Sequence, residues 1–235
     1  MHGSEVNKEK GTFYFKLLAK GLFSFLAMIV VIFALAGRLT YWQGWLFNGI
    51  LALIVVIASM LFVNKTDLIE ERAKPGPGTK WWDKVFYALY VPAFLSIVVI
   101  APLDAGRYGW TPPLPVIFYV ASCTIFVLSN IIYLWAMWVN RFFSSTVRIQ
   151  TDRGHEVVRT GPYRLVRHPG YVGGILLGIG TATVLGSLWA LTPAGAVAVL
   201  LMMRTYLEDT TLQRELPGYA DYAHEVKYRL LPGVW

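Results

Sequence analysis

The chain has 235 residues, of which 56% are hydrophobic and 15% are charged, with a net charge of +7 and a mean hydropathy of +0.51. About a quarter of the residues in a soluble domain are charged, so this composition excludes an ordinary soluble domain and indicates a membrane protein. The positive charge is explained by membrane topology and anionic lipid headgroups, and we prefer these partners to nucleic acid.

Five runs without ionisable residues predict the membrane spans: residues 21–37, 39–64, 85–103, 108–140 and 169–203. A span needs about 20 apolar residues, so each of the first four runs predicts one helix. The fifth would be about 52 Å long as a single helix at 1.5 Å per residue. We therefore expect it to break near residues 186–195 and to form a helical hairpin. The predicted fold is an all-α integral membrane protein with about six transmembrane helices.

Lysines and arginines flank these runs unevenly. They gather before the first run (Lys8, Lys10, Lys16 and Lys20), in residues 65–84 and in residues 141–167. The positive-inside rule then predicts that both termini and these two basic connections are cytoplasmic, in the inner membrane of a cell. Signal-peptide cleavage after Ala34-Leu35-Ala36 is the less favoured interpretation, because several further spans follow.

The chain divides by composition at residue 140. Residues 1–140 form a predicted transmembrane scaffold of about four spans, and residues 141–235 combine a polar loop, the hairpin and a C-terminal helix interrupted at Pro217-Gly218. Cys123 is the single cysteine, so we expect no disulfide framework and no metal site built on cysteine and histidine.

Ionisable residues from both ends of the hairpin should meet at the cytoplasmic surface. His155, Arg167 and His168 precede it, while Arg204 and Glu208 follow it, four residues apart on one helical face. Such a site offers cations for a carboxylate or phosphate, a carboxylate for an ammonium group, and tyrosines that stack on a ring. Each residue alone could be a membrane anchor or a simple i,i+4 pair, but their convergence favours a binding site.

The spacing of these residues carries a family resemblance. His155, Val158, Gly161, Tyr163, Arg167, His168, Pro169, Tyr171 and Gly173 fit the pattern H-x-x-V-x-x-G-x-Y-x-x-x-R-H-P-x-Y-x-G. The tail follows with Arg204, Glu208-Asp209, Leu212, Pro217-Gly218-Tyr219, Tyr222 and Arg229-Leu230-Leu231-Pro232, which is similar to the ending R-x-x-x-E-E…G-x-x-Y…P. This half of the chain resembles the isoprenylcysteine carboxyl methyltransferase family and related membrane phospholipid methyltransferases.

The resemblance implies a methyltransferase that uses S-adenosylmethionine, with a lipophilic small molecule or lipidated substrate as the methyl acceptor. It implies catalytic roles for Arg204 and Glu208. It further implies a cofactor site made of His155, Val158, Tyr163, Arg167, His168, Pro169, Tyr171, Gly174 and Glu208 in the cytoplasmic loop and the helices that follow it. Carboxyl methylation of an isoprenylcysteine-like acceptor is the expected reaction, although Asp209 replaces a common second glutamate and Gly174 a common aromatic residue.

Other functions remain open on the sequence alone. A related membrane enzyme could methylate a phospholipid amine or a thiol. A reductase of the sterol-reductase type would have a similar hairpin but would bind NADPH, and residues 141–235 show no additional basic cluster for its 2′-phosphate. A non-catalytic lipid-binding protein would use the same arginines only for headgroups.

Overall fold

The computed structural model describes the backbone of residues 2–235 and the side chains of residue 12 and residues 15–235. The predicted basic residues Lys8 and Lys10 therefore lie outside the described side chains. Over residues 2–235 the chain is helical, without strands. The α-helices are α1 (His2–Ala36), α2 (Trp42–Phe62), α3 (Thr66–Ala73), α4 (Trp81–Ala101), α5 (Val116–Val139), α6 (Pro169–Val184), α7 (Leu191–Glu215) and α8 (Tyr219–Glu225).

Four helical segments are long and apolar enough to cross a membrane: Phe15–Ala36, Trp42–Phe62, Trp81–Tyr108 and Val116–Val139. They correspond to the first four predicted spans. The third is longer than expected because a π-helical turn, η1 (Pro102–Tyr108), continues α4. The fifth run does break, at residues 185–190. Its first half, α6, has 16 residues, so it is shorter than the other spans.

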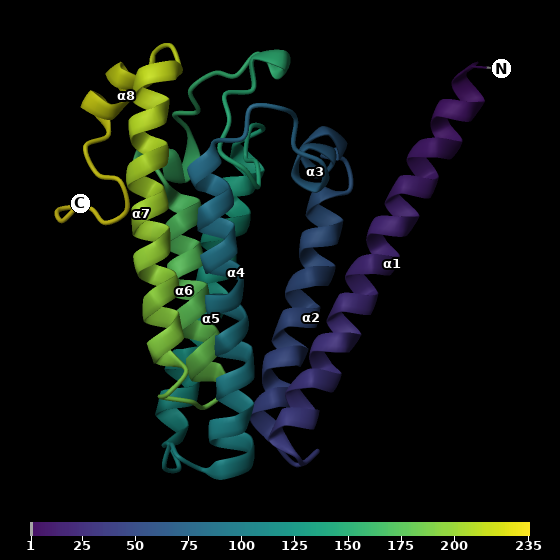
Figure 1. The fold of residues 1–235 in the computed structure, drawn as a ribbon, viewed down its shortest axis with the longest axis vertical. Coiled ribbons are helices and arrows are strands. Elements are labelled where there is room, and N and C mark those ends of the chain that lie inside the picture. The colour runs from purple at the N-terminus through teal and green to yellow at the C-terminus, as the bar shows by residue number, and fades with distance from the viewer. Residues whose placement is uncertain (1) are drawn as a thin grey trace.

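Helices α4, α5, α6 and α7 pack side by side, and α1 and α2 lie beside them (Figure 1). The buried core of the bundle includes Ile97, Phe126, Val184, Val197 and Leu201. α3, α8 and the long connection between α5 and α6 gather at the upper end in Figure 1, which is also the end at which the chain begins. The bundle therefore has one end rich in polar connections, and the site is built there.

Glycines allow α6 to lie against its neighbours at short distance. A Cβ atom at Gly173 would lie 2.9 Å from the carbonyl oxygen of Ser129 on α5, and one at Gly180 would lie 2.8 Å from Cα of Phe126. Small residues at such positions are typical of helix pairs inside membranes. Gly174 faces α7, where its Cβ position is 3.1 Å from the Leu201 side chain.

The opposite end of the bundle is fixed by Asp104, which is fully buried. Its carboxylate accepts hydrogen bonds from the amide and hydroxyl of Thr111, both at 2.6 Å, and from the hydroxyl of Ser187 at 2.5 Å. Ser187 belongs to the turn between α6 and α7. One buried carboxylate thus holds the hairpin turn against η1, which sets how far α6 and α7 extend toward the polar end.

Candidate functional site

A cavity opens at the polar end of the bundle. Its lining comes from α3, α4, α5, α6, α7, α8 and the connection before α6. The residues are Arg72, Tyr87, Tyr133, Asn140, 142–148, Gln150, 155–158, Tyr163, Arg167, His168, Gly170, Tyr171, Arg204, Glu208, Leu212, Leu216, Tyr219 and Tyr222. The wall is therefore shared between the predicted scaffold half and the predicted cofactor-binding half of the chain.

Most of the predicted site residues meet in this cavity: His155, Val158, Tyr163, Arg167, His168, Tyr171, Arg204 and Glu208 all line it. Pro169 and Gly174 lie elsewhere. Pro169 is the first residue of α6, where its missing N–H costs no helical hydrogen bond. Gly174 packs against Leu201 between α6 and α7. These two residues shape the helix that carries the site, and they do not form its surface.

Glu208 and Tyr171 join the two ends of the hairpin. The Tyr171 hydroxyl donates a hydrogen bond to Oε2 of Glu208, which fixes the carboxylate at the cavity wall. The Tyr171 ring also stacks on the His168 imidazole, with 5.7 Å between centroids and 13° between planes. The glutamate therefore presents a positioned negative charge beside an aromatic surface, as recognition of an ammonium group requires.

Arg204 pairs with Asp83 of α4, and not with Glu208 one turn away. Nη2 of Arg204 lies 3.0 Å from Oδ1 of Asp83 and donates to the carbonyl of Ser145 at 2.8 Å. Asp83 is fully buried, and its other oxygen accepts from the Val147 amide at 2.9 Å. The simple i,i+4 pair considered from the sequence is therefore replaced by a link between α7, α4 and the loop.

Two polar atoms at the cavity are buried without a hydrogen-bond partner: Nε of Arg204 and Oγ1 of Thr146. Both residues line the cavity. Buried polar groups in proteins are almost always hydrogen-bonded, so two unsatisfied groups at one wall indicate a place for a polar ligand. The Arg204 guanidinium is also enclosed by aromatic rings, 4.5 Å from the Phe86 centroid and 4.9 Å from that of Tyr87.

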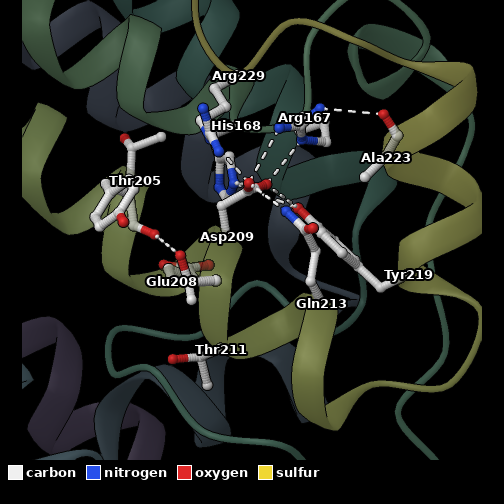
Figure 2. A network of polar contacts seen from close by, with 12 residues as sticks. Arg167, His168, Thr205, Glu208, Asp209, Thr211, Gln213, Tyr219, Ala223 and Arg229 are labelled. Atoms are coloured by element: carbon white, nitrogen blue, oxygen red, sulfur yellow. Dashed lines mark hydrogen bonds and ion pairs between the residues drawn. The ribbon is translucent and has the colours of Figure 1, made fainter.

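Asp209 organises the polar wall behind His168 (Figure 2). The carboxylate is fully buried and lies in ion pairs with Arg167 at 2.7 Å and Arg229 at 2.8 Å. It also contacts Nε2 of His168 at 3.2 Å and accepts from the hydroxyl of Tyr219 at 3.1 Å. Aspartate in place of the second glutamate thus serves as the centre of a structural network.

Arg167 is held by protein groups on every side. Besides Asp209 it donates through Nη1 to the carbonyl oxygens of Val226 at 2.7 Å and Lys227 at 3.0 Å. Its contribution is to fasten the residues after α8 to the start of α6. His168 is fixed by the same network, and its ring faces both Asp209 and Tyr171.

His155 and Tyr163 form part of the loop side. Nδ1 of His155 accepts a hydrogen bond from the Gln150 amide at 3.2 Å, and its ring packs on Phe142 with centroids 4.7 Å apart. Burial lowers the pKa of His155, and the nearby Arg148 and Arg153 act in the same direction. The imidazole is therefore neutral near pH 7, and it presents a ring surface to the cavity without adding charge.

The loop that carries these residues is fastened to α3. Arg148 donates through Nε and Nη2 to both oxygens of Glu71, at 3.0 and 2.8 Å, and its Nη1 lies 2.8 Å from Asp152. Burial alone would raise the pKa of Glu71, but the hydrogen bonds and charge of Arg148 outweigh it and the pKa is lowered. This buried pair covers one side of the cavity.

Sequence reasoning missed the contribution of residues 1–140. Arg72, Asp83, Tyr87 and Tyr133 all belong to that half, and none lies in the motifs that predicted the site. One signal was available for Asp83: an acidic residue within the first turn of an apolar helix is costly to bury and usually has a partner. The sequence did not identify Arg204 as that partner, because the two residues are far apart in the chain.

The comparisons with known proteins agree with this region of the chain. The family model for the isoprenylcysteine carboxyl methyltransferase (ICMT) family matches residues 121–214, which run from α5 through the loop and hairpin to Arg204 and Glu208. Residues 121–214 are therefore similar to the ICMT family. The matched segment includes the motif residues of the hairpin and the preceding loop that line the cavity, while Arg72 and Asp83 lie before it.

Two curated relatives of the ICMT family are similar over the same part. Both are described as probable protein-S-isoprenylcysteine O-methyltransferases, from Oryza sativa subsp. indica and Oryza sativa subsp. japonica. Each is 30% identical over 115 residues, which covers 46% of this chain and 58% of the relative. The similarity thus spans little more than half the length of these relatives.

Proposed function

We propose that this protein transfers a methyl group from S-adenosylmethionine to a lipophilic acceptor at the membrane. The favoured reaction is carboxyl O-methylation of an isoprenylcysteine-like acceptor. One observation carries the proposal: the loop motif and the α7 motif meet at one cavity, where Glu208 is fixed by Tyr171 and the buried Nε of Arg204 has no partner. The similarity of residues 121–214 to the ICMT family supports the reaction that fits this arrangement.

The residues of the cavity fit such a cofactor. Glu208 supplies a fixed carboxylate for an ammonium group, and the unsatisfied hydroxyl of Thr146 supplies a polar contact. His155, Phe142 and Tyr163 supply ring surfaces for a purine. We propose cofactor contacts from His155, Val158, Tyr163, His168, Tyr171 and Glu208, with Arg167, Pro169 and Gly174 acting through the shape of the site.

The protein's contribution to the reaction is then alignment and the exclusion of water. When bound, the cofactor supplies an already activated methyl group, so a carboxylate acceptor needs no general base from the protein. Arg204, held by Asp83 and the Ser145 carbonyl, keeps its Nε toward the cavity and orients the acceptor oxygen. The aromatic rings around Arg204 and the loop over the cavity keep solvent from the reacting atoms.

We further propose how the chain lies in the membrane. The four long apolar helices cross it, and the apolar parts of α6 and α7 add two shorter crossings, giving six. Both termini, α3, α8 and the loop would then lie on the cytoplasmic side of a cell's inner membrane, in contact with membrane lipids. Residues 1–140 would act as scaffold and residues 141–235 as the cofactor-binding region, with the cavity wall shared between them.

Ligand titration of the purified protein in detergent tests the cofactor. S-adenosylhomocysteine should bind. NADPH, the cofactor that a reductase would require, should not bind. His168→Ala and Glu208→Ala should each weaken S-adenosylhomocysteine binding by about 1–3 kcal/mol, because each variant loses a charge-assisted hydrogen bond of the cofactor site. Arg164→Ala, at an exposed residue of the same loop, is the matched control.

The outcomes separate the functions left open by the sequence. Binding of NADPH in place of S-adenosylhomocysteine would favour the reductase. Failure to bind either ligand would favour a lipid-binding protein. Radiolabelled methyl transfer then distinguishes the acceptor, because a thio-prenyl acid, a phospholipid amine and a thiol are offered in separate assays.

A further inference from the structure

The arginines of the cavity differ in how their charge is balanced. Four line it: Arg72, Arg148, Arg167 and Arg204. Three are paired with a buried carboxylate located behind the wall: Arg148 with Glu71, Arg167 with Asp209 and Arg204 with Asp83. Among the side chains that the structure describes, no carboxylate forms an ion pair with Arg72. Arg72 is therefore the arginine of the cavity wall whose charge is not balanced by an ion pair with a carboxylate among the described side chains.

The surroundings of Arg72 hold its guanidinium without neutralising it. Nη2 donates to the hydroxyl of Tyr133 at 3.0 Å, and the group lies 5.2 Å from the Phe143 ring centroid and 5.9 Å from that of Tyr133. Its backbone is tied to the loop, because the Ser145 hydroxyl donates to the Arg72 carbonyl at 3.2 Å. A guanidinium held beside two aromatic rings and by one hydrogen bond is well suited to donate to a carboxylate.

The same rings connect Arg72 to the centre of the site. Phe143 packs on the first turn of α6, where a Cβ atom at Gly170 would lie 2.7 Å from its ring. Tyr133 packs on Gly173 in the same helix. Tyr171, between these two glycines, carries the hydroxyl that holds Glu208. Arg72 is thus connected, through Phe143 and Tyr133, to the start of α6, which carries residues that we assign to the methyl donor.

We propose that Arg72 binds the carboxylate of the methyl acceptor. This inference rests on the proposed function and adds to it a specificity-determining residue that lies outside the family-matched segment. Arg204, already balanced by Asp83, orients the acceptor oxygen, while Arg72 supplies the charge that selects an acid over a neutral lipid. A carboxylate could also belong to the amino-acid part of the cofactor, so the experiment measures the two ligands separately.

The reaction itself removes this attraction. A carboxylate oxygen forms a bond to the methyl carbon as the sulfur–methyl bond breaks, the sulfur keeps the electron pair, and no proton moves. The acceptor is anionic before the step and a neutral ester after it. Arg72 therefore binds the acceptor about equally in the substrate complex and in the transition state, while the carboxylate still carries negative charge, which lowers KM without raising kcat. It binds the neutral ester less strongly, which favours product release.

Kinetics of Arg72→Gln test the assignment, with N-acetyl-S-farnesylcysteine as acceptor. The KM for the acceptor should rise by about 10- to 100-fold, as expected for a lost charge-assisted hydrogen bond. The kcat should stay within about threefold, and calorimetry should give an unchanged Kd for S-adenosylhomocysteine. Arg141→Gln is the matched control, because Arg141 is an exposed arginine that is not part of the cavity lining. Like Arg72, it lies beside an aromatic ring, with its guanidinium 5.0 Å from the centroid of Phe142.

A second measurement needs no catalysis and begins with the wild-type protein. The free acid and its carboxamide are compared as ligands by calorimetry, and the acid should bind at least about tenfold more tightly. Arg72→Lys keeps the positive charge and provides a second test if Arg72→Gln does not fold. Part of the preference for the acid should remain in this variant. In Arg72→Gln the two ligands should bind alike.

The contrary outcomes are separate from failure of the proposed function. An unchanged preference for the acid in Arg72→Gln, or a raised Kd for S-adenosylhomocysteine with an unchanged acceptor KM, would overturn the role of Arg72 alone. A wild-type protein that neither binds S-adenosylhomocysteine nor methylates the acid would remove the proposed function and this inference together.

Discussion

Buried carboxylates are the residues on which the site depends most. Asp83, Asp209 and Glu71 each sit behind the cavity wall and each fixes an arginine that lines it. Removing one partner of a buried ion pair leaves an uncompensated charge, which is costly. The arginines can therefore hold one orientation toward a ligand, because their other donors are already committed to these carboxylates and to backbone carbonyls.

Asp83→Asn tests this positioning role. The substitution keeps the shape and an acceptor for the Val147 amide, but it removes the charge that holds Arg204. We expect kcat/KM for methyl transfer to fall by about 10- to 1000-fold, since misalignment of reacting groups is costly. The Kd for S-adenosylhomocysteine should change by less than about threefold.

A double variant distinguishes a role of Asp83 through Arg204 from a merely structural role. If Asp83 acts through Arg204, then Arg204→Lys should cause a similar loss, and the double variant should lose little more than either single variant. Asp221→Asn, at an exposed position of α8, is the control. Additive losses, or full activity in Asp83→Asn, would remove Asp83 from the mechanism.

Short elements at the polar end convert a helical bundle into an enclosed site. The segment before α6 is fastened to α3 through Arg148 and Glu71 and to α4 through Lys80, whose amide donates to the Val147 carbonyl at 3.2 Å. Gly76, in the turn between α3 and α4, lies under Arg148, where a Cβ atom would be 2.7 Å from Nη2. A glycine is required there because the buried guanidinium occupies that space.

The Glu71–Arg148 pair predicts a pH dependence for this element. The pKa of Glu71 is lowered in the folded protein, so its contribution to stability is complete above the unfolded pKa of about 4.3. It is lost as the pH falls through the lower folded value, because the unfolded state binds the proton first. The contribution of Glu71 to the unfolding temperature should therefore decline as the pH falls below about 4.3.

Comparison with Glu71→Gln isolates this contribution. Glutamine cannot titrate, so the variant should unfold at a lower temperature at pH 7 and should show a shallower decline on acidification. Unfolding is followed by tryptophan fluorescence in detergent from pH 7 down to about pH 2, which covers the range below the unfolded pKa of about 4.3. Glu225→Gln is the control, because Glu225 forms an exposed ion pair with Arg159. Parallel curves for wild type and Glu71→Gln would show that the pair does not control acid stability.

On the scale of the whole molecule, the two ends of the bundle have different chemistry. The polar end holds the cavity, α3 and α8 (Figure 1). The other end holds η1, the 109–115 connection and the α6–α7 turn, joined through Asp104. If α6 and α7 cross the membrane, the α6–α7 turn must lie on the side opposite the cavity.

Cysteine labelling in a Cys123→Ala background tests six crossings against four. Ala220→Cys, exposed in α8, should react with an impermeant reagent only from the cytoplasmic side. Trp189→Cys, in the α6–α7 turn and 60% exposed, should react only from the opposite side. Pro113→Cys marks that opposite side independently. If Trp189→Cys and Ala220→Cys are both labelled from the cytoplasm, α6 and α7 do not cross the membrane and the chain crosses it four times.

Much of this architecture follows from local sequence properties. Uncharged runs located the four long helices, because the length and polarity of a span are constrained by the bilayer. The turn between α6 and α7, at residues 185–190, overlaps the break predicted near residues 186–195, and Pro217-Gly218 separated α7 from α8 as expected. The motif residues on both sides of the hairpin predicted a shared site, since a hairpin returns its ends to one surface. The short helix α3 was missed because its eight residues show no long apolar face.

The sequence by itself determined the four long helices, the hairpin and the eight motif residues that line one cavity, because these depend on composition, chain direction and local spacing. Tertiary structure decided the pairings. It placed Asp83 with Arg204, Glu71 with Arg148 and Arg72 without a carboxylate, and it placed Gly174 in a helix contact instead of the cavity wall. Ion pairs between residues far apart in the chain depend on how helices pack, and helix packing is set by side-chain shapes across several elements at once.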